Sequence, residues 1–210
     1  MVRIYFCDTE KNEHLLNSAI NLLTEERREK AEKISDENKK NLSIAAGLML
    51  KYAVCENEEK EIRHNEHGKL YLEHGPFFSI SHSGKLSVVA IAENEIGVDT
   101  EIRKEINKRI INRCFTDDEA EYAFLSTENY LRIWTAKEAA LKLLGTGFYY
   151  SPKNFSVLPL DAEHEIGGRK IRFFITEICN QPVTVAYCGK EELEIKEFIL
   201  NDFLETEAKI

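Results

Sequence analysis

The sequence predicts an α+β fold built from two halves of similar make-up, divided near residue 100. The chain opens with an alternating strand pattern at residues 2–8, and two amphipathic helical segments follow it. Short strand patterns joined by tight turns come next, and helices followed by strands then appear a second time. This repeated order is consistent with a duplication, although no fixed-period repeat is visible.

In the first half, apolar residues recur with helical spacing over residues 15–34 and 38–56. Strand patterns then cover residues 77–81, 86–92 and 96–101, with tight turns between them. Three short strands connected in this way predict an antiparallel meander.

The second half begins with three helical patterns, at residues 105–113, 117–126 and 128–144. Thr116 is a suitable N-cap for the second of these helices, and Gly145 and Gly147 stop the third. Further strands are expected at residues 154–158, 170–177, 182–188 and 193–200.

Composition narrows the class of protein. The chain has 210 residues, of which 43% are hydrophobic, so it can form a packed core. No apolar run approaches the roughly 20 residues of a membrane span, and the first residues read as a strand rather than a signal peptide. We therefore expect a soluble, cytoplasmic protein. The five scattered cysteines contain no Cys-x-x-Cys pair and are expected to be reduced core thiols.

The net charge of −9 argues against a general nucleic-acid binder, which needs a basic face. An acidic protein that handles phosphates must gather its positive charge locally.

Two acids in the first half form a candidate metal site. Asp99 and Glu101 are two apart in a strand pattern, so they share a face about 7 Å apart along the backbone. Such carboxylates repel unless a cation lies between them, and Mg²⁺ prefers oxygen ligands. The alternative is an ordinary polar strand end.

A second acid lies on the helix at residues 128–144. Glu138 and Lys142 are i and i+4 and so share a face, where their simplest role is a surface ion pair. Trp134, Leu141 and Leu144 border Glu138, which predicts that this turn is partly buried. Three carboxylates and one lysine are the groups needed to hold a divalent metal and a phosphate together, so the set points to phosphoryl chemistry.

Three motifs resemble one family. They are Phe78-Ser79-Ile80-Ser81-His82-Ser83-Gly84, Ile96-Gly97-Val98-Asp99-Thr100-Glu101, and Trp134-Thr135-Ala136-Lys137-Glu138-Ala139-Ala140-Leu141-Lys142. In order and spacing the chain resembles the 4′-phosphopantetheinyl transferases of the longer, monomeric type that activates peptide synthetases. The resemblance implies two similar α/β subdomains, here 1–100 and 101–210, related by a pseudo-twofold axis. Coenzyme A would bind in the cleft between them.

The resemblance also implies an activity. Members transfer the phosphopantetheine arm of coenzyme A to a serine of an apo acyl or peptidyl carrier protein and release adenosine 3′,5′-bisphosphate. Asp99, Glu101 and Glu138 match ligands of Mg²⁺, with Mn²⁺ as an alternative. Lys142 would stabilise charge on the leaving phosphate. Glu138 is the first candidate for the base that accepts the serine proton, and Glu119 is the rival.

Five further residues match positions that contact coenzyme A in the family. Ser81 and His82 match phosphate contacts, Lys69 matches a lysine near the nucleotide, and Arg27 and Lys30 match a basic pair near the 3′-phosphate. For Arg27 and Lys30 a solvated helix face is the competing interpretation, and His64, His67 and His74 are expected to be solvated. The chain departs from the family at Leu70, where proline is common, and at Ile44, where a hydroxyl can occur.

We expect coenzyme A and an apo carrier protein as partners, with neither a nucleic acid nor a membrane, and a chain that acts as a monomer. Two other functions use the same residues. A metal-dependent phosphohydrolase would use water in place of the carrier serine, and a binding module would hold coenzyme A or the carrier without turnover.

Overall fold

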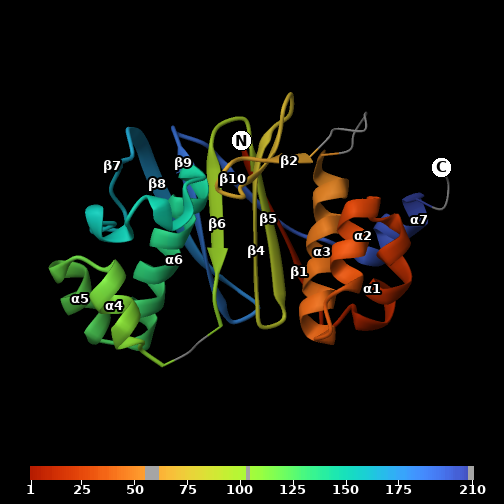
Figure 1. Cartoon of the computed structure of the whole chain (residues 1–210), viewed down its shortest axis with the longest axis horizontal. Coiled ribbons are helices and arrows are strands. Elements are labelled where there is room, and N and C mark those ends of the chain that lie inside the picture. Colours follow the sequence, from red (N-terminus) through yellow and green to blue (C-terminus); the bar gives the residue numbers. More distant parts are fainter. Residues whose placement is uncertain (55–61, 103–104, 208–210) are drawn as a thin grey trace.

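The computed structural model describes residues 1–54, 62–102 and 105–207. Two four-stranded sheets occupy the middle of the molecule, and the helices cover its two outer flanks (Figure 1). The expectation of a mixed α+β fold is confirmed.

The first sheet has the strand order β10-β1-β5-β4. β1 (Val2–Asp8) pairs antiparallel with β5 (Leu86–Ala92), which pairs antiparallel with β4 (Phe77–Ser83). β10 (Leu193–Glu197) returns from far along the chain and pairs parallel with β1. The helices beside this sheet are α1 (Glu13–Ala19), α2 (Glu25–Glu32), α3 (Glu37–Val54) and α7 (Leu200–Glu207), with η1 (Ile20–Leu22) after α1 (Figure 1).

The second sheet is antiparallel, in the order β6-β9-β8-β7. Its strands are β6 (Ile96–Thr100), β9 (Gln181–Cys188), β8 (Arg169–Ile178) and β7 (His164–Ile166). On its flank lie α4 (Lys108–Cys114), α5 (Asp117–Phe124) and α6 (Thr127–Leu144), followed by the short turns η2 (Gly147–Tyr149) and η3 (Pro152–Asn154). β2 (Ile62–His64) and β3 (Leu70–Leu72) form a separate hairpin.

Three clusters of buried apolar side chains hold these layers together. One lies between the first sheet and its helices, one between the second sheet and its helices, and one between the two sheets. β1 contributes to two of them, because Val2 and Ile4 face the second sheet while Tyr5 and Cys7 face the helices. A strand buried on both faces explains why the N-terminal run is so apolar.

The single helix expected at residues 15–34 is wrong. The chain leaves the helical conformation at Leu23 and Thr24, whose ψ angles are 156° and 153°, and α2 begins at Glu25. Leu23 is buried against α3 at Gly47, where an added Cβ would lie 2.6 Å from the Leu23 Cδ2 atom. This long-range contact overrides the local helical pattern. The helix expected at 38–56 is confirmed as α3, and residues 55 and 56 lie outside the described residues.

The three-stranded meander is also wrong. β4 and β5 form the expected hairpin, but β6 pairs with β9 in the other sheet. The strand expected at 154–158 is absent too. Pro152 opens η3 there, and the Val157 N–H is taken by the Glu119 carboxylate instead of a neighbouring strand. The strand expected at 193–200 ends at Glu197, and Leu200 already begins α7.

Four cysteines are described and all four are free. Cys7 and Cys114 are buried as expected, but Cys179 is exposed in the β8–β9 turn, so the expectation of core thiols is wrong for it. Cys55 lies outside the described residues. Among the described helices, none has both the length and the apolar character needed to cross a membrane.

Candidate active site

A glycine brings β6 and α6 into direct contact. A Cβ atom on Gly97 would lie 1.9 Å from the Ala139 carbonyl oxygen and 2.5 Å from the Leu143 backbone nitrogen. Only a residue without a side chain permits this approach. Because Ala139 and Leu143 directly follow Glu138 and Lys142 in α6, the contact also holds those two side chains near the acids of β6.

Alternate serines of β4 join it to β6. The hydroxyl oxygens of Ser79, Ser81 and Ser83 accept hydrogen bonds from the backbone N–H groups of Val98, Thr100 and Ile102, at 3.0, 3.2 and 3.1 Å. Side chains thus take the place of a backbone ladder between the two edge strands, and the two sheets meet without merging. We call these three residues the serine row.

Asp99 lies at the centre of the site, with its side chain only 7% exposed. Its Oδ1 atom accepts hydrogen bonds from the Lys142 ammonium at 2.7 Å and the Ser81 hydroxyl at 3.0 Å. Its Oδ2 atom is buried with no hydrogen-bond partner among the described residues. Burial raises the pKa of Asp99, although the Lys142 charge opposes the shift. One ammonium therefore does not fully compensate for the desolvation of this carboxylate.

Glu101 is held from two directions. The Ser83 hydroxyl donates to its Oε2 atom at 3.1 Å, and the Trp134 indole N–H donates to its Oε1 atom at 3.4 Å. Asp99 and Glu101 thus bond to serines that are themselves two residues apart on β4. This geometry agrees with the expectation that the two acids share one face.

Glu138 is the unpaired acid of the set. It lies half-buried on α6, and no described group forms a hydrogen bond or ion pair with it. Its pKa is raised to about 7, mainly by burial and then by the Asp99 charge; the Lys142 charge opposes this rise and the Glu101 charge adds to it. A carboxylate with this pKa can exchange a proton near neutral pH.

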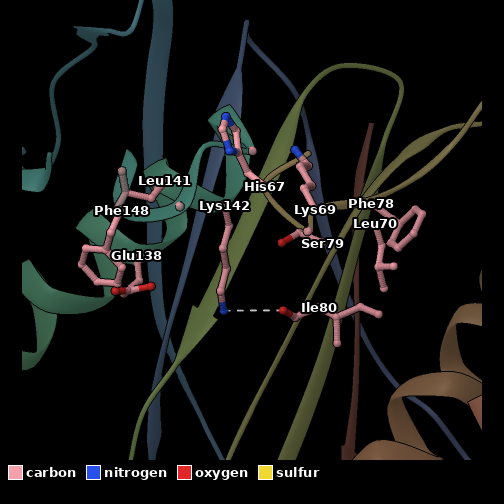
Figure 2. Close-up of a pocket in the computed structure, with 13 residues that line it drawn as sticks. His67, Lys69, Leu70, Phe78, Ser79, Ile80, Glu138, Leu141, Lys142 and Phe148 are labelled. Carbon is pink, nitrogen blue, oxygen red and sulfur yellow. Dashed lines mark hydrogen bonds between the residues drawn. The ribbon is translucent and has the colours of Figure 1, made fainter. Parts of the chain in front are cut away.

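A pocket of about 290 Å³ opens beside these residues. Glu138, Leu141 and Lys142 of α6 line one side, and Phe78, Ser79 and Ile80 of β4 line the opposite side (Figure 2). His67, Gly68, Lys69 and Leu70 of the β2–β3 turn and Gly145, Gly147 and Phe148 after α6 complete the lining. The Lys142 ammonium reaches across the pocket to the Ile80 carbonyl oxygen, 3.5 Å away (Figure 2).

Lys69 lies in this pocket, but its ammonium is occupied. It donates to the carbonyl oxygens of Leu143 at 2.7 Å and Ile96 at 3.5 Å, so it caps the C-terminal end of α6. Burial lowers its pKa to about 8. Asn65 supports the same contact by donating to the Gly145 carbonyl oxygen at 2.8 Å.

Ser81 is buried and accepts a hydrogen bond from Lys142 at 2.9 Å. His82 follows it on the opposite face of β4, and its side chain is exposed. Its pKa is lowered, with desolvation as the main cause, a backbone hydrogen bond opposing it and the Lys142 charge contributing.

The two basic residues of α2, Arg27 and Lys30, have different surroundings. Arg27 packs beside α3 at Gly47, and burial lowers its pKa. Within the described part of the chain its Nη2 atom is buried with no partner. Lys30 is 60% exposed and pairs with Glu26 at 2.6 Å, which agrees with the solvated-face interpretation for that residue. A buried guanidinium nitrogen without a partner is unusual, and an anion would satisfy it.

Glu119 lies apart from the carboxylates of β6. It has no exposed surface and pairs at 2.8 Å with Lys137, which is also fully buried. Its two oxygens further accept the N–H groups of Thr116 and Val157, both at 2.8 Å. Thr116 is the N-cap of α5, as expected. In this arrangement Glu119 is not available to a substrate hydroxyl.

Sequence reasoning misses three features of the site. It places Ser83 in a turn, although the spacing of two from Ser81 is a signal for a shared face. It expects His67 to be solvated, but this residue lines the pocket and stacks on Tyr149 with ring centroids 4.5 Å apart. Phe148 stacks on Trp134 at 6.5 Å. No local pattern predicts these ring contacts, because they join distant segments.

No three His, Cys, Asp or Glu side chains in the described part of the chain form a ready-made metal site. Asp99, Glu101 and Glu138 nevertheless influence one another, since the Asp99 and Glu101 charges both raise the pKa of Glu138. The donor set is therefore a group of mutually repelling carboxylates, with Lys142 lying against one of them.

Part of the chain, including two elements of this site, is similar to known proteins. The family model described as the 4′-phosphopantetheinyl transferase superfamily matches residues 95–190, which include β6 and α6. The matched part is slightly less than half of the 210 residues, so the comparison shows a similarity to this superfamily. It is similar to the 4′-phosphopantetheinyl transferase gsp of Aneurinibacillus migulanus, with 32% identity over 106 residues, covering 47% of this chain and 44% of the relative.

Two other members of the superfamily are similar. A 4′-phosphopantetheinyl transferase of Bacillus subtilis is 33% identical over 106 residues, covering 47% of each chain. The 4′-phosphopantetheinyl transferase Sfp of Bacillus subtilis (strain 168) is 26% identical over 162 residues, covering 70% of each chain. The chain thus spans less than half of the length of the first two relatives.

Proposed function

We propose that this chain transfers the 4′-phosphopantetheine group of coenzyme A to a serine of an apo carrier protein and releases adenosine 3′,5′-bisphosphate. The observation that carries the proposal is the convergence of Asp99 and Glu101 with Glu138 and Lys142 beside one pocket. The names of the similar proteins support the reaction class.

The chemistry of the donors fits a magnesium ion. Asp99 has a buried oxygen without a partner, and its pKa stays raised despite Lys142. Hard carboxylate oxygens are the ligands that Mg²⁺ and Mn²⁺ prefer. We propose Asp99, Glu101 and Glu138 as the residues that would hold it. When bound, such an ion supplies charge stabilisation at a pyrophosphate.

The side chains of this chain then have separate roles. Glu138 accepts the proton of the carrier serine as the serine oxygen forms a bond to the phosphorus that carries the pantetheine arm. The bond from that phosphorus to the bridging oxygen breaks, and its electron pair leaves on the adenosine-side phosphate. The Lys142 ammonium lies close enough to the acids to stabilise this charge.

We propose that the rest of coenzyme A meets positive and polar groups both in the pocket wall and outside its lining. We propose that Ser81 and His82 contact its phosphates and that Arg27, whose buried nitrogen lacks a partner, meets the 3′-phosphate. Lys69 would contribute from the pocket wall. Lys30 would have to leave its ion pair with Glu26 to take part.

We also propose how the subdomains of the protein are arranged and in what form it acts. The presence of one four-stranded sheet and one 18-residue helix (α3 or α6) on each side of the molecule supports two subdomains related by a pseudo-twofold axis. The proposed division at residue 100 places β6 with the first half by sequence, although β6 pairs in the second sheet. We further propose a monomer that acts in the cytoplasm on coenzyme A and a carrier protein.

The test is a labelling assay. The purified chain is incubated with coenzyme A, Mg²⁺ and a panel of apo carrier proteins, and the carriers are weighed by mass spectrometry. We expect the mass of one phosphopantetheine group to appear on at least one carrier. A known transferase should label the same panel as a control. No mass gain on any carrier would overturn the proposal, and release of phosphopantetheine without an acceptor would favour hydrolysis.

Glu138→Gln should lower the labelling rate by about 10²–10⁴-fold, because an amide cannot accept the serine proton. The variant should be at least as stable as the wild type at pH 8 in thermal denaturation without metal. A carboxyl whose folded pKa is about 7 is ionised at pH 8 at a cost to the folded state, and glutamine removes this cost. An unchanged labelling rate would remove Glu138 from the reaction.

A further inference from the structure

The direction of each hydrogen bond in the serine row is fixed by the partners. Ser83 accepts from the Ile102 backbone N–H, which can only donate, so its own hydroxyl proton is left for another acceptor. That acceptor is the Glu101 Oε2 atom at 3.1 Å, a carboxylate oxygen that can only accept when ionised. Ser83 thus connects the backbone of β6 to the side chain of the second acid.

Ser81, two residues before Ser83 on β4, likewise accepts from a backbone N–H group and donates to a carboxylate. It accepts from the Thr100 N–H and from Lys142 and donates to Asp99. Ser79 accepts from the Val98 N–H at the pocket end of the row. The two serines nearest the acids therefore do more than join the strands, because each fixes one carboxylate oxygen.

Glu101 is less enclosed than Asp99. Asp99 is buried and also bonded to Lys142, whereas Glu101 is half-buried and follows the last residue of β6. Its second oxygen has the longer contact, 3.4 Å to Trp134. A long, flexible acid at the end of a strand loses side-chain freedom when it holds an ion, and a preformed hydrogen bond reduces that loss.

We propose that Ser83 is a positioning residue, which orients the Glu101 carboxylate for a divalent cation through its hydroxyl group. The inference rests on the proposed function, in which Glu101 is one of the metal-binding acids. Ser83 is not a metal ligand in this proposal, and it touches no substrate. It acts through Glu101 alone.

A matched pair of variants tests the hydroxyl. Ser83→Val and Ser83→Thr place side chains of the same branched shape in a strand, and only threonine keeps the hydroxyl. Mn²⁺ binding is measured directly on the full chain without coenzyme A, by electron paramagnetic resonance of the free ion. We expect the dissociation constant for Mn²⁺ to rise by about 10–100-fold in Ser83→Val and by no more than about threefold in Ser83→Thr.

Ser87→Ala provides the control for a lost buried hydroxyl. Ser87 lies on the neighbouring strand β5 and donates to the Leu42 carbonyl oxygen at 3.3 Å, away from the acids. This variant should bind Mn²⁺ like the wild type, and its melting temperature reports the purely structural effect. Labelling by Ser83→Val should also recover as the metal concentration rises, since the defect lies in metal binding.

The outcomes separate the two proposals. Equal Mn²⁺ binding by the wild type and Ser83→Val would overturn the role of Ser83 and leave the proposed function intact. Equal weakening in Ser83→Val and Ser83→Thr would also overturn it, because the hydroxyl would then be irrelevant. If the wild-type chain bound no Mn²⁺, both the metal part of the proposed function and this inference would fail.

Discussion

At the level of single residues, the two glutamates that the sequence offers as the base have opposite surroundings. Glu138 is half-buried, unpaired and beside a pocket, and its pKa is raised to about 7. Glu119 is fully buried, and its oxygens are used by Lys137 and by two backbone N–H groups. The surroundings of Glu138 allow its carboxylate to exchange protons, whereas those of Glu119 hold its carboxylate in fixed hydrogen bonds. The structure therefore favours Glu138 over Glu119 as the base.

Glu119→Gln should destabilise the chain by about 3–5 kcal/mol, because it leaves the Lys137 ammonium buried without its counter-charge. Lys137 would keep its hydrogen bonds to the carbonyl oxygens of Pro152 and Phe155, each at 2.7 Å, and its contact with the Phe155 ring, 4.5 Å from the centroid, but none of these carries a negative charge. Urea denaturation measures this loss, and Glu128→Gln, which breaks an exposed pair on α6, is the control. If Glu119→Gln were as stable as the wild type but inactive, Glu119 would instead have a chemical role.

The stability contributed by Lys69 should depend on pH. Its pKa is about 8 in the folded chain and about 10.4 when unfolded, so folding releases a proton between these values. The unfolded state then binds more protons, and stability rises with pH across this window. The free energy of unfolding of the wild type and of Lys69→Met should be measured by denaturation at pH 7 and at about pH 9.5. We expect the wild type to gain stability relative to Lys69→Met at the higher pH. A constant difference would contradict this ionisation.

At the scale of elements, the contact between β6 and α6 is the one on which the site depends. Gly97 has no side chain, so the helix backbone rests directly on the strand, and Asp99 comes within 2.7 Å of Lys142. The serine row then connects β6 to β4 from the other side. The acids lie where these two contacts meet.

Gly97→Ala should separate α6 from β6, since its Cβ atom would overlap the backbone of Ala139 and Leu143. We expect a lower melting temperature together with loss of most labelling activity. Gly189→Ala is the control, because its Cβ atom meets nothing within 4 Å and only its positive φ of 87° is strained. Normal activity in Gly97→Ala would show that the contact does not position the site.

At the scale of the whole molecule, the chain crosses between the two sheets. β6 follows β5 in sequence but joins β9, and β10 follows β9 but joins β1. Apolar side chains from both sheets, including Val2, Ile4 and Val185, also form one shared core. Neither sheet is complete without residues from the other half of the chain.

Unfolding should therefore be a single cooperative transition. Trp134 is the only tryptophan and reports on α6, while far-ultraviolet circular dichroism reports on the whole chain. Denaturation curves followed by the two signals should coincide. Separate midpoints would show that the second half unfolds independently and that the shared core does not couple the sheets.

Most of the elements could be predicted because their patterns are local. α3, α6 and the β4–β5 hairpin follow from helical spacing, alternation and a glycine turn. The errors have a common cause in long-range contacts. Leu23 leaves its helix to pack on Gly47, and β6 leaves the expected meander for β9. The short strands β2, β3 and β7 were not predicted, because three residues give too little pattern.

The order of the residues is enough to specify which chemical groups are present and how they are spaced. The two-residue step from Asp99 to Glu101 and the four-residue step from Glu138 to Lys142 are local geometry, so the order of residues is enough to predict them. The surroundings of each group, in contrast, depend on how the whole chain folds. Burial, the serine row and the closeness of β6 to α6 come from residues far apart in sequence. These contacts leave Glu138 free, bind Glu119 to Lys137 and turn Lys69 towards the end of a helix.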